Sequence, residues 1–592
     1  MSLIFTAGAA FLAVSLHRVQ VERFSALSHD QLRQSVRRVQ VPGPRGNIYD
    51  RNGGLLAGNR PSYCIAYYVE ELRRRGRWQN TIDAVDADID RLAKALGIPR
   101  VITKKDVTRH VMQSLPMPLL AWRDVEHETL ARWAEAVEPF PGVDVYVQPE
   151  RYYPQGALAA HVLGYVGRDR PQPLPGQKIH FYLPEMIGKG GVEGRYNADL
   201  TGVSGGQLIR VDARGYKHAV WEGDAAVPGQ DIHLTLDINI QAALEQVLRG
   251  WRGAGVVIDP RNGEVLAMAS SPAYDPNDFV PILPSGVWKR LNEDKAVPLF
   301  NRAVQGWYAP GSTFKPVTAM AALLSGKFNP EDEYVCDGAF VLGTMRLRCW
   351  NTYGHGSINL RKAIEQSCNS YFCNLAHTIG YDSIYETARL LGFGEPCGID
   401  LPGESGGLLP TAAWKERRLR DRWRPGDTCQ IAIGQGLLIT TPLQMAVVTS
   451  VFANGGRLYR PHIARLAQPH LVREMGWPPQ AVAVVRDGMR DVAELGTGRR
   501  VRVRGLTVAA KTGTAEVDTG GTRRKNTWVT AFAPFGEPSA AVAIMVENGE
   551  SGGLTVAPMV REVLVSIFGE EPAASEEAGE PLFAPDAEVR GD

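Results

Sequence analysis

The segment GAGVVIDPRNGEVLAMAS, residues 253–270, decides the fold of the larger part of this 592-residue chain. Two apolar runs flank a Pro-Arg-Asn-Gly turn, a pattern that predicts a β-hairpin. A further apolar run at Ala541–Val546 predicts a strand near the far end of the same region. Helical apolar spacing dominates between them. Strands at both ends with helices between indicate one antiparallel sheet flanked by a helical layer.

The chain before this region has a different pattern of predicted helices and strands. Helical spacing predicts helices at Asp83–Leu96 and Glu126–Ala136, and alternation predicts a strand at Val143–Val147. Pro228-Gly229-Gln230 then breaks the pattern. We therefore expect an α+β multidomain protein, with an elongated α/β pedestal over residues 23–228 and a second domain over residues 229–568.

The two ends of the chain carry special signals. Residues 2–16 (SLIFTAGAAFLAVSL) are uncharged and predict a membrane anchor over residues 1–22, continuing as a helix from Val19 to about Arg38. The uncharged run spans about 22 Å as a helix, short of the ~30 Å hydrocarbon core, and snorkelling by Arg18 narrows the gap. A cleavable signal peptide is the alternative, although its basic leader is missing. The acidic tail, residues 569–592, predicts disorder.

The composition excludes several classes of protein. Hydrophobic residues make up 44% and charged residues 22%, which fits a globular core and excludes wholesale disorder. Lysine plus arginine (65) balance aspartate plus glutamate (64), which argues against a nucleic-acid partner. No motif for an organic cofactor stands out.

One S-x-x-K sequence opens a helix. Ser312-Thr313-Phe314-Lys315 precedes the apolar run Pro316–Leu324, and proline is well tolerated in a first turn. A spacing of three places the Ser312 hydroxyl and the Lys315 amine on one face, as an activated serine requires. The helix start also offers N–H groups for an oxyanion. The alternative is that this S-x-x-K sequence occurs by chance and has no catalytic role.

A K-T-G-T sequence follows an apolar strand. Lys511 and the hydroxyls of Thr512 and Thr514, with the side-chain-free Gly513 between them, would let a peptide lie along a strand edge with its carboxylate bound. The alternative is an ordinary strand with a solvated lysine.

A third motif is S-x-N. Ser367-Cys368-Asn369 ends the predicted helix Leu360–Gln366. A second S-x-N at Ser357-Ile358-Asn359 is discounted, because Ser357 and Asn359 are typical of the start of that same helix.

Three cysteines and a histidine lie between these motifs. Cys336, Cys349, His355 and Cys368 read C-x12-C-x5-H-x12-C, and three thiolates with one imidazole make a closed tetrahedral zinc site. The alternative is a Cys336–Cys349 disulfide, with His355 as a turn residue. For the metal site, Asp337 is a reserve ligand. The remaining cysteines are expected to be buried small apolar residues: Cys64, Cys373, Cys397 and Cys429.

The order S-x-x-K, S-x-N, K-T-G resembles that of penicillin-binding proteins and serine β-lactamases. Other stretches resemble the monofunctional class B transpeptidases, and the likeness runs from Val19 to Phe568. They are PRGNIYDRNGGLLAGN (44–59), RYYPQGALAAHVLGYVG (151–167), WYAPGSTFKP (307–316) and IAIGQGLLITTPLQMA (431–446). Within the first stretch, Arg45, Gly46, Asp50 and Arg51 are interpreted as packing and turn residues.

The resemblance implies a β-lactamase-like transpeptidase domain and a D,D-transpeptidase reaction. Ser312 would attack the penultimate D-Ala carbonyl of a stem peptide and release the terminal D-Ala. Lys315 would take the serine proton, which requires its pKa to fall by about 3 units. Ser367, held by Asn369, would relay a proton to the leaving amine. β-Lactams would acylate Ser312.

The resemblance also implies how the substrate is held. Lys511, Thr512 and Thr514 would bind the terminal carboxylate, and the N–H groups of Ser312 and Thr514 would form the oxyanion hole. Some elongation-type members, known as penicillin-binding protein 2, are similar in carrying a metal site at matching places.

The implied setting is the cell inner membrane, crossed once, with the catalytic domain on the periplasmic side. The expected partners are stem peptides, lipid-linked glycan strands and a glycan polymerase of the shape, elongation, division and sporulation (SEDS) type. Three alternatives stay open: a division-specific class B enzyme, a serine β-lactamase, and a mainly non-catalytic activator of a polymerase.

Overall fold

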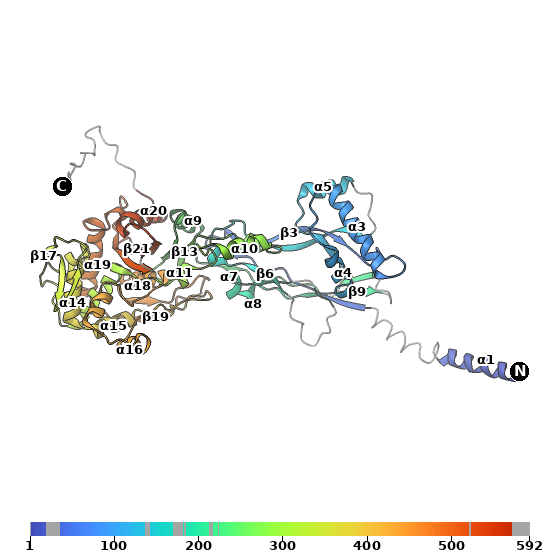
Figure 1. Ribbon diagram of the computed structural model, residues 1–592, viewed down its shortest axis with the longest axis horizontal. Helices are drawn as coiled ribbons and strands as arrows, with labels where there is room; N and C mark the ends of the chain where they lie inside the picture. The colour runs from blue at the N-terminus through green and yellow to red at the C-terminus, as the bar shows by residue number, and fades with distance from the viewer. Residues whose placement is uncertain are drawn as a thin grey trace, which may run out of the picture. The chain divides into compact units, whose positions relative to one another are not determined.

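The computed structural model describes residues 2–18, 36–115, 117–136, 142–169, 181–182, 185–211, 217–222, 224–519 and 522–570. It divides into two compact units (Figure 1). Unit 1 comprises Met1–Leu234 and Ala273–Val297, and unit 2 comprises Thr235–Pro272 and Pro298–Asp592.

Unit 2 is built on a five-stranded antiparallel sheet. Its strands are β12 (Gly253–Ile258), β13 (Val265–Ser271), β20 (Ala509–Thr519), β21 (Thr522–Ala533) and β22 (Ala540–Glu547). They lie in the order β13-β12-β22-β21-β20, so strands from the two ends of the unit meet at β12 and β22. The predicted hairpin at residues 253–270 and the strand at Ala541–Val546 are both confirmed.

Both faces of this sheet are covered by helices. Figure 1 draws α9 (Ile238–Leu248) and α20 (Ala557–Phe568) on one side of it and α18 (Pro442–Ala453) on the other. Val542, Ile544 and Val546 share a core cluster with α9 and α20. Every residue of α18 is buried, so this helix has no polar, solvent-facing side. Because both faces of the sheet are covered, β22 is a continuous apolar run from Ala540 to Val546.

The middle of unit 2 carries the remaining elements. Its helices are α11 (Arg302–Gln305), η3 (Gly311–Phe314), α12 (Lys315–Ser325), α13 (Leu360–Glu365), α14 (Asn369–Ile379), α15 (Tyr381–Leu390), α16 (Ala412–Leu419), α17 (Pro425–Ala432), α19 (Pro479–Glu494), η4 (Arg499–Val501) and η5 (Gly552–Val556). Its short strands are β14 (Tyr334–Cys336), β15 (Ala339–Leu342), β16 (Met345–Arg348), β17 (Gly356–Ile358), β18 (Arg457–Tyr459) and β19 (Leu471–Glu474).

Unit 1 holds several smaller sheets. One has the order β10-β9-β1-β7 and another β11-β2-β3-β4, with β5 also paired to β3. The strands are β1 (Val36–Val41), β2 (Ile48–Tyr49), β3 (Leu55–Tyr67), β4 (Leu119–Trp122), β5 (Val143–Tyr152), β6 (Val166–Asp169), β7 (Phe181–Tyr182), β8 (Glu185–Gly188), β9 (Gly205–Val211), β10 (Lys217–Glu222) and β11 (Ile232–His233).

Unit 1 contains further helices besides its sheets. They are α3 (Trp78–Leu96), α4 (Lys104–Gln113), α5 (His127–Ala136), α6 (Ala160–Leu163), α7 (Gly191–Arg195), α8 (Asn197–Leu200), η2 (Pro276–Phe279) and α10 (Ser285–Glu293). The apolar stripe of α3, including Ile82, Val85 and Ile89, is buried in a core with Ile65 and Tyr67 of β3. The predicted helices of this region and its strand at Val143–Val147 are confirmed.

The predicted helix from Val19 to about Arg38 is wrong at its end. Residues 19–35 lie outside the described part of the chain, and Val36–Val41 forms β1, antiparallel to β9. The sequence VRRVQV suits a strand equally well, and the partner strand settles the choice by satisfying its backbone groups.

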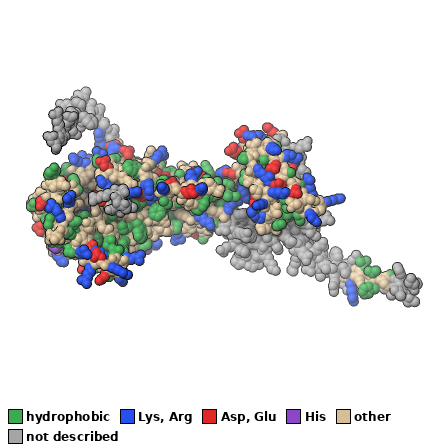
Figure 2. Space-filling model, viewed as in Figure 1, with side chains coloured by type: hydrophobic (Ala, Val, Ile, Leu, Met, Phe, Trp, Pro, Cys, Tyr) green, Lys and Arg blue, Asp and Glu red, His purple; other side chains and the backbone are tan. Residues whose placement is uncertain are grey.

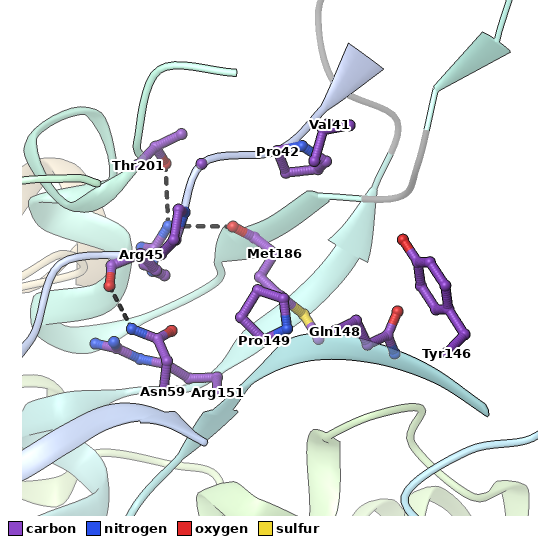
Figure 3. Close-up of a pocket in the computed structure, with 12 residues that line it drawn as sticks. Val41, Pro42, Arg45, Asn59, Tyr146, Gln148, Pro149, Arg151, Met186 and Thr201 are labelled. Carbon is purple, nitrogen blue, oxygen red and sulfur yellow. Dashed lines mark hydrogen bonds between the residues drawn. The ribbon is translucent and has the colours of Figure 1, made fainter. Parts of the chain in front are cut away.

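Arg45 is a packing residue, as expected for the motif at residues 44–59. Its Nε donates to Glu193 at 2.6 Å, and Arg151 Nε donates to the other carboxylate oxygen at 2.6 Å. Burial alone would raise the pKa of Glu193, but the two guanidinium groups hold it below its ordinary value. Figure 3 shows Arg45 bonded to Met186 and Thr201 beside a cavity of ≈ 80 Å³ in unit 1.

The expected anchor is represented by α1 (Ser2–His17). No helix in the described residues combines the length and apolar character that a membrane crossing requires. The predicted disordered tail lies outside the described residues from residue 571 onward.

The surface carries both signs of charge. On the displayed face of each unit, Lys and Arg side chains are interspersed with Asp and Glu (Figure 2). This distribution agrees with the balanced composition of the sequence.

Candidate active centre and metal cluster

Ser312 lies in the turn η3 that leads into α12. Gly311, at φ 57°, donates its N–H to the carbonyl of Gly434 at 2.7 Å. The indole of Trp528 on β21 donates to the Ala309 carbonyl at 3.0 Å. The serine turn is thereby fixed from two sides, and Ser312 itself stays partly exposed.

The K-T-G-T sequence lies on β20, the edge strand beside this turn. A Cβ added at Gly513 would lie 3.0 Å from the Pro310 carbonyl oxygen and 3.2 Å from the Thr313 nitrogen. One added at Gly311 would lie 3.1 Å from the Thr514 carbonyl carbon. The close approach of turn and strand therefore depends on the missing side chains.

Ser367 joins the two lysines. Lys511 Nζ donates to Ser367 Oγ at 2.9 Å, and Lys315 Nζ reaches the same oxygen at 3.2 Å. Lys315 also donates to the Ser367 carbonyl at 2.6 Å and to Asn369 Oδ1 at 2.7 Å. Ser367 adopts φ 54°, a left-handed conformation that a non-glycine residue rarely takes and that is common at functional sites.

Both amines are fully buried. Burial lowers the pKa of Lys315 to about 8, against a smaller opposite effect of the nearby cysteine sulfurs. Burial, followed by the charge of Lys315, lowers the pKa of Lys511 well below its ordinary value. The deprotonated amine that proton transfer from a serine requires therefore becomes accessible at Lys315 near neutral pH.

Two contacts differ from the sequence expectation. Among the described residues, no hydrogen bond joins the Ser312 hydroxyl to Lys315. The Asn369 side chain was expected to hold Ser367, but its Oδ1 accepts a hydrogen bond from Lys315 Nζ. The amine is thus oriented by the S-x-N segment, and hydrogen bonds of a catalytic pair are often long before substrate binds.

The two threonines of K-T-G-T have their own partners. Thr514 Oγ1 accepts the N–H of Gly552 at 3.3 Å. Thr512 Oγ1 lies 2.6 Å from Thr497 Oγ1, in the loop after α19. Sequence analysis did not name Thr497, Gly434 or Trp528. The GTG sequence at residues 496–498 was a local signal for Thr497, and the quoted stretch 431–446 contains Gly434.

The discounted S-x-N does not reach the active centre. Asn359 caps α13 by accepting the N–H of Lys362, as predicted. Ser357 lies on β17 instead, where it donates to Glu333 at 2.5 Å.

The four predicted metal ligands converge. Their ligand atoms all lie within 4.8 Å of one another. His355 Nδ1 is 3.5 Å from Cys336 Sγ and 3.6 Å from Cys349 Sγ, and the sulfurs of Cys349 and Cys368 are 3.9 Å apart. A tetrahedral zinc ion, with bonds of about 2.3 Å to sulfur and about 2.0 Å to nitrogen, places two sulfur ligands about 3.8 Å apart and a sulfur and a nitrogen about 3.5 Å apart. The distances in the cluster match these values.

The chemistry of the cluster also fits a metal. All seven cysteines of the chain are unpaired, so the alternative Cys336–Cys349 disulfide is absent. Backbone N–H groups that include those of Asn369 and Ser370, at the start of α14, favour the thiolate form of Cys349. Asp337, the reserve ligand, is outside the cluster.

The remaining cysteines follow the expectation with one exception. Cys64, Cys373 and Cys429 are buried, and Cys397 is partly exposed.

Comparison with known proteins identifies the family. The family model described as "Penicillin binding protein transpeptidase domain" matches residues 253–565, and "Penicillin-binding Protein dimerisation domain" matches residues 40–234. The chain belongs to the penicillin-binding protein transpeptidases.

Relatives of this family cover nearly the whole chain. "Peptidoglycan D,D-transpeptidase MrdA" of Acinetobacter baumannii is 35% identical, over 90% of this chain and 82% of its own. Penicillin-binding protein 2 of Helicobacter pylori, solved in complex with MreC, has a TM-score of 0.76 and 30% identity, covering 89% of this chain and 98% of its own. A chain from a structure described as "Structural coordination of polymerization and crosslinking by a peptidoglycan synthase complex" has a TM-score of 0.73 and 29% identity. The match covers 97% of this chain and 99% of its own.

The penicillin-binding transpeptidase predicted from the three motifs is confirmed. The protein is a peptidoglycan D,D-transpeptidase of the penicillin-binding protein 2 type. A secreted β-lactamase has no need of the dimerisation domain matched over residues 40–234.

Proposed function

We propose that this transpeptidase cross-links stem peptides during cell elongation through an acyl-enzyme on Ser312. Ser312 Oγ forms a bond to the penultimate D-Ala carbonyl carbon, and the bond to the terminal D-Ala nitrogen breaks. An amine of a second stem peptide then displaces the serine. The convergence of two buried lysines on Ser367, beside the serine turn, is the observation that carries this assignment.

The proton route uses the groups around Ser367. Neutral Lys315 takes the Ser312 proton, and Asn369 keeps the amine oriented. Ser367 gives its proton to the leaving D-Ala nitrogen and is reprotonated from a lysine within hydrogen-bond distance. The lowered pKa of Lys315 supports this role, because a base must be unprotonated at working pH.

β20 supplies the substrate-binding groups. Lys511, Thr512 and Thr514 hold the terminal carboxylate of the stem peptide. The N–H groups of Ser312 and Thr514 bind the oxyanion, and the contact of Gly311 with the Thr514 backbone brings these two together. β-Lactams acylate Ser312 in place of the peptide.

The relatives support a proposal for the cellular setting. Solved relatives are described in complex with MreC and within a peptidoglycan synthase complex. We place this chain with a SEDS-type glycan polymerase that consumes lipid-linked precursors, anchored once in the inner membrane by residues 1–22 with unit 2 on the periplasmic side. A division-specific role is the second candidate, and the metal cluster favours elongation.

A structural zinc ion completes the proposal. Cys336, Cys349, His355 and Cys368 would hold it, and the bound ion would tie β14 and the segment before β17 to the start of α14. Because Cys368 is the middle residue of S-x-N, the same ligand would restrain Ser367.

Mapping of a penicillin adduct tests the acyl-enzyme. The full chain is incubated with benzylpenicillin, digested and analysed by peptide mass spectrometry. The peptide carrying Ser312 should gain the mass of the drug, and Ser312→Ala should gain none. An unmodified Ser312 peptide in the wild type would overturn the assignment.

Metal analysis tests the zinc site. Zinc is counted per chain in the wild type, in Cys349→Ala and in the matched variant Cys397→Ala, which lies outside the cluster. The wild type and Cys397→Ala should hold one ion, and Cys349→Ala should hold much less. An equal, near-zero zinc content in all three proteins would contradict the proposed zinc site.

A further inference from the structure

The loop that follows α19 links two of the catalytic motifs. Arg361 of α13 forms a bidentate ion pair with Asp491 of α19, at 2.5 and 2.9 Å. Gly496 then approaches the end of α13 so closely that an added Cβ would lie 2.3 Å from the Glu365 carbonyl oxygen. One face of this loop is therefore fixed against the helix that precedes Ser367.

The next residue of the loop faces the K-T-G-T strand. Thr497 Oγ1 lies 2.6 Å from Thr512 Oγ1, and either oxygen could be the donor. A Cβ added at Gly553 would lie 2.5 Å from the Thr497 carbonyl oxygen, so the backbone of Thr497 is also held from this side. The hydroxyl pair is thus held by contacts on both sides of the loop.

A hydroxyl has one proton, which decides the direction of this hydrogen bond once substrate is bound. If Thr512 donates to a substrate carboxylate, its oxygen can only accept from Thr497. If Thr512 donates to Thr497, nothing is left for the carboxylate. The pair therefore has one orientation that binds an anion and one that does not.

We propose that Thr497 is a positioning residue: it donates to Thr512 and thereby directs the Thr512 proton at the carboxylate of the incoming peptide. This inference rests on the proposed role of Thr512. Donation from Thr497 also polarises the Thr512 hydroxyl, which strengthens its bond to an anion. Thr497 contributes to the selection of substrates that end in a free carboxylate.

The test separates binding from chemistry. Thr497→Val keeps the shape and removes the hydroxyl, whereas Thr497→Ser keeps the hydroxyl. For benzylpenicillin, the dissociation constant of the non-covalent complex should rise about tenfold in Thr497→Val, with a smaller change in the acylation rate constant. Thr497→Ser should recover most of the affinity. The penicillin methyl ester, which lacks the carboxylate charge, should bind all three proteins alike.

A double-mutant cycle with Thr512→Val distinguishes positioning from loop packing. If Thr497 acts through Thr512, Thr497→Val adds little further loss in the Thr512→Val background. Unchanged affinity in Thr497→Val, equal losses for acid and ester, or additive losses in the cycle would each overturn the inference. Failure of the wild type to be acylated at Ser312 would instead overturn the proposed function.

Discussion

At the scale of single residues, the active centre is organised by burial of charge. Lys315 and Lys511 are both fully buried and share the hydroxyl of Ser367. Two ammonium groups so close together and removed from water disfavour each other's charge. The residue that unites them is the strained Ser367, which places its hydroxyl and its carbonyl at Lys315 simultaneously.

The pH dependence of acylation should report Lys315. Its pKa is lowered to about 8, so the neutral, base-competent fraction rises with pH through that value. The rate constant for acylation by a penicillin should increase about tenfold per pH unit below it and level off above it. Stopped-flow measurements on the wild type check this, and a rate that is flat across this range would contradict the role of Lys315.

At the scale of elements, the active centre depends on the packing of η3 against β20. Gly513 permits this contact, since its missing side chain leaves room for Pro310 and Thr313. Gly434 plays the same part behind the turn, because a Cβ there would lie 1.9 Å from the Gly311 carbonyl oxygen. The serine turn thus fits between a strand and a loop that each present a glycine to it.

Gly513→Ala should impair acylation more than folding. The new methyl group forces the serine turn away from β20 by a few tenths of an ångström, and we expect a loss of about tenfold or more in the acylation rate constant. Gly536→Ala is the matched control, since a Cβ there meets nothing within 4 Å. Equal acylation rates in both variants would show that the turn does not need this contact. The thermal midpoint should move little in either.

At the scale of the whole molecule, the chain forms two units with separate cores. Ile65, Tyr67 and Val85 belong to the core of unit 1, whereas Val542 and Val560 belong to that of unit 2. The ion-pair cluster of Arg45, Glu193 and Arg151 lies wholly in unit 1. A change there should therefore act on one unit alone.

Glu193→Gln should destabilise unit 1 selectively. The substitution leaves two buried guanidinium groups without their counter-charge, which costs about 3–5 kcal/mol. Calorimetry should show the transition of unit 1 at a lower temperature, while that of unit 2 and the acylation of Ser312 persist. Glu135→Gln, at an exposed position on α5, is the control and should change neither.

The same cluster should make unit 1 sensitive to acid. The pKa of Glu193 is lowered in the folded protein, so its contribution to stability is complete above the unfolded value of about 4.3 and is lost as pH falls through the folded pKa. The wild type should lose stability of unit 1 over this window, and Glu193→Gln should lose less. An identical acid dependence in both proteins would exclude Glu193 as the cause.

The sequence alone determined the chemistry-bearing residues and the main elements. Ser312, Lys315, Ser367 and Lys511 could be named because each motif has a local spacing, and the hairpin at residues 253–270 because strands and turns follow local patterns. The four members of the cysteine and histidine cluster could be named from their spacing as well. The tertiary structure decided which side chains are in contact: Lys315 contacts Asn369, 54 positions away, and Thr497 contacts Thr512, 15 positions away on a different element. Such contacts arise when helices and strands pack, so no local pattern of residues records them.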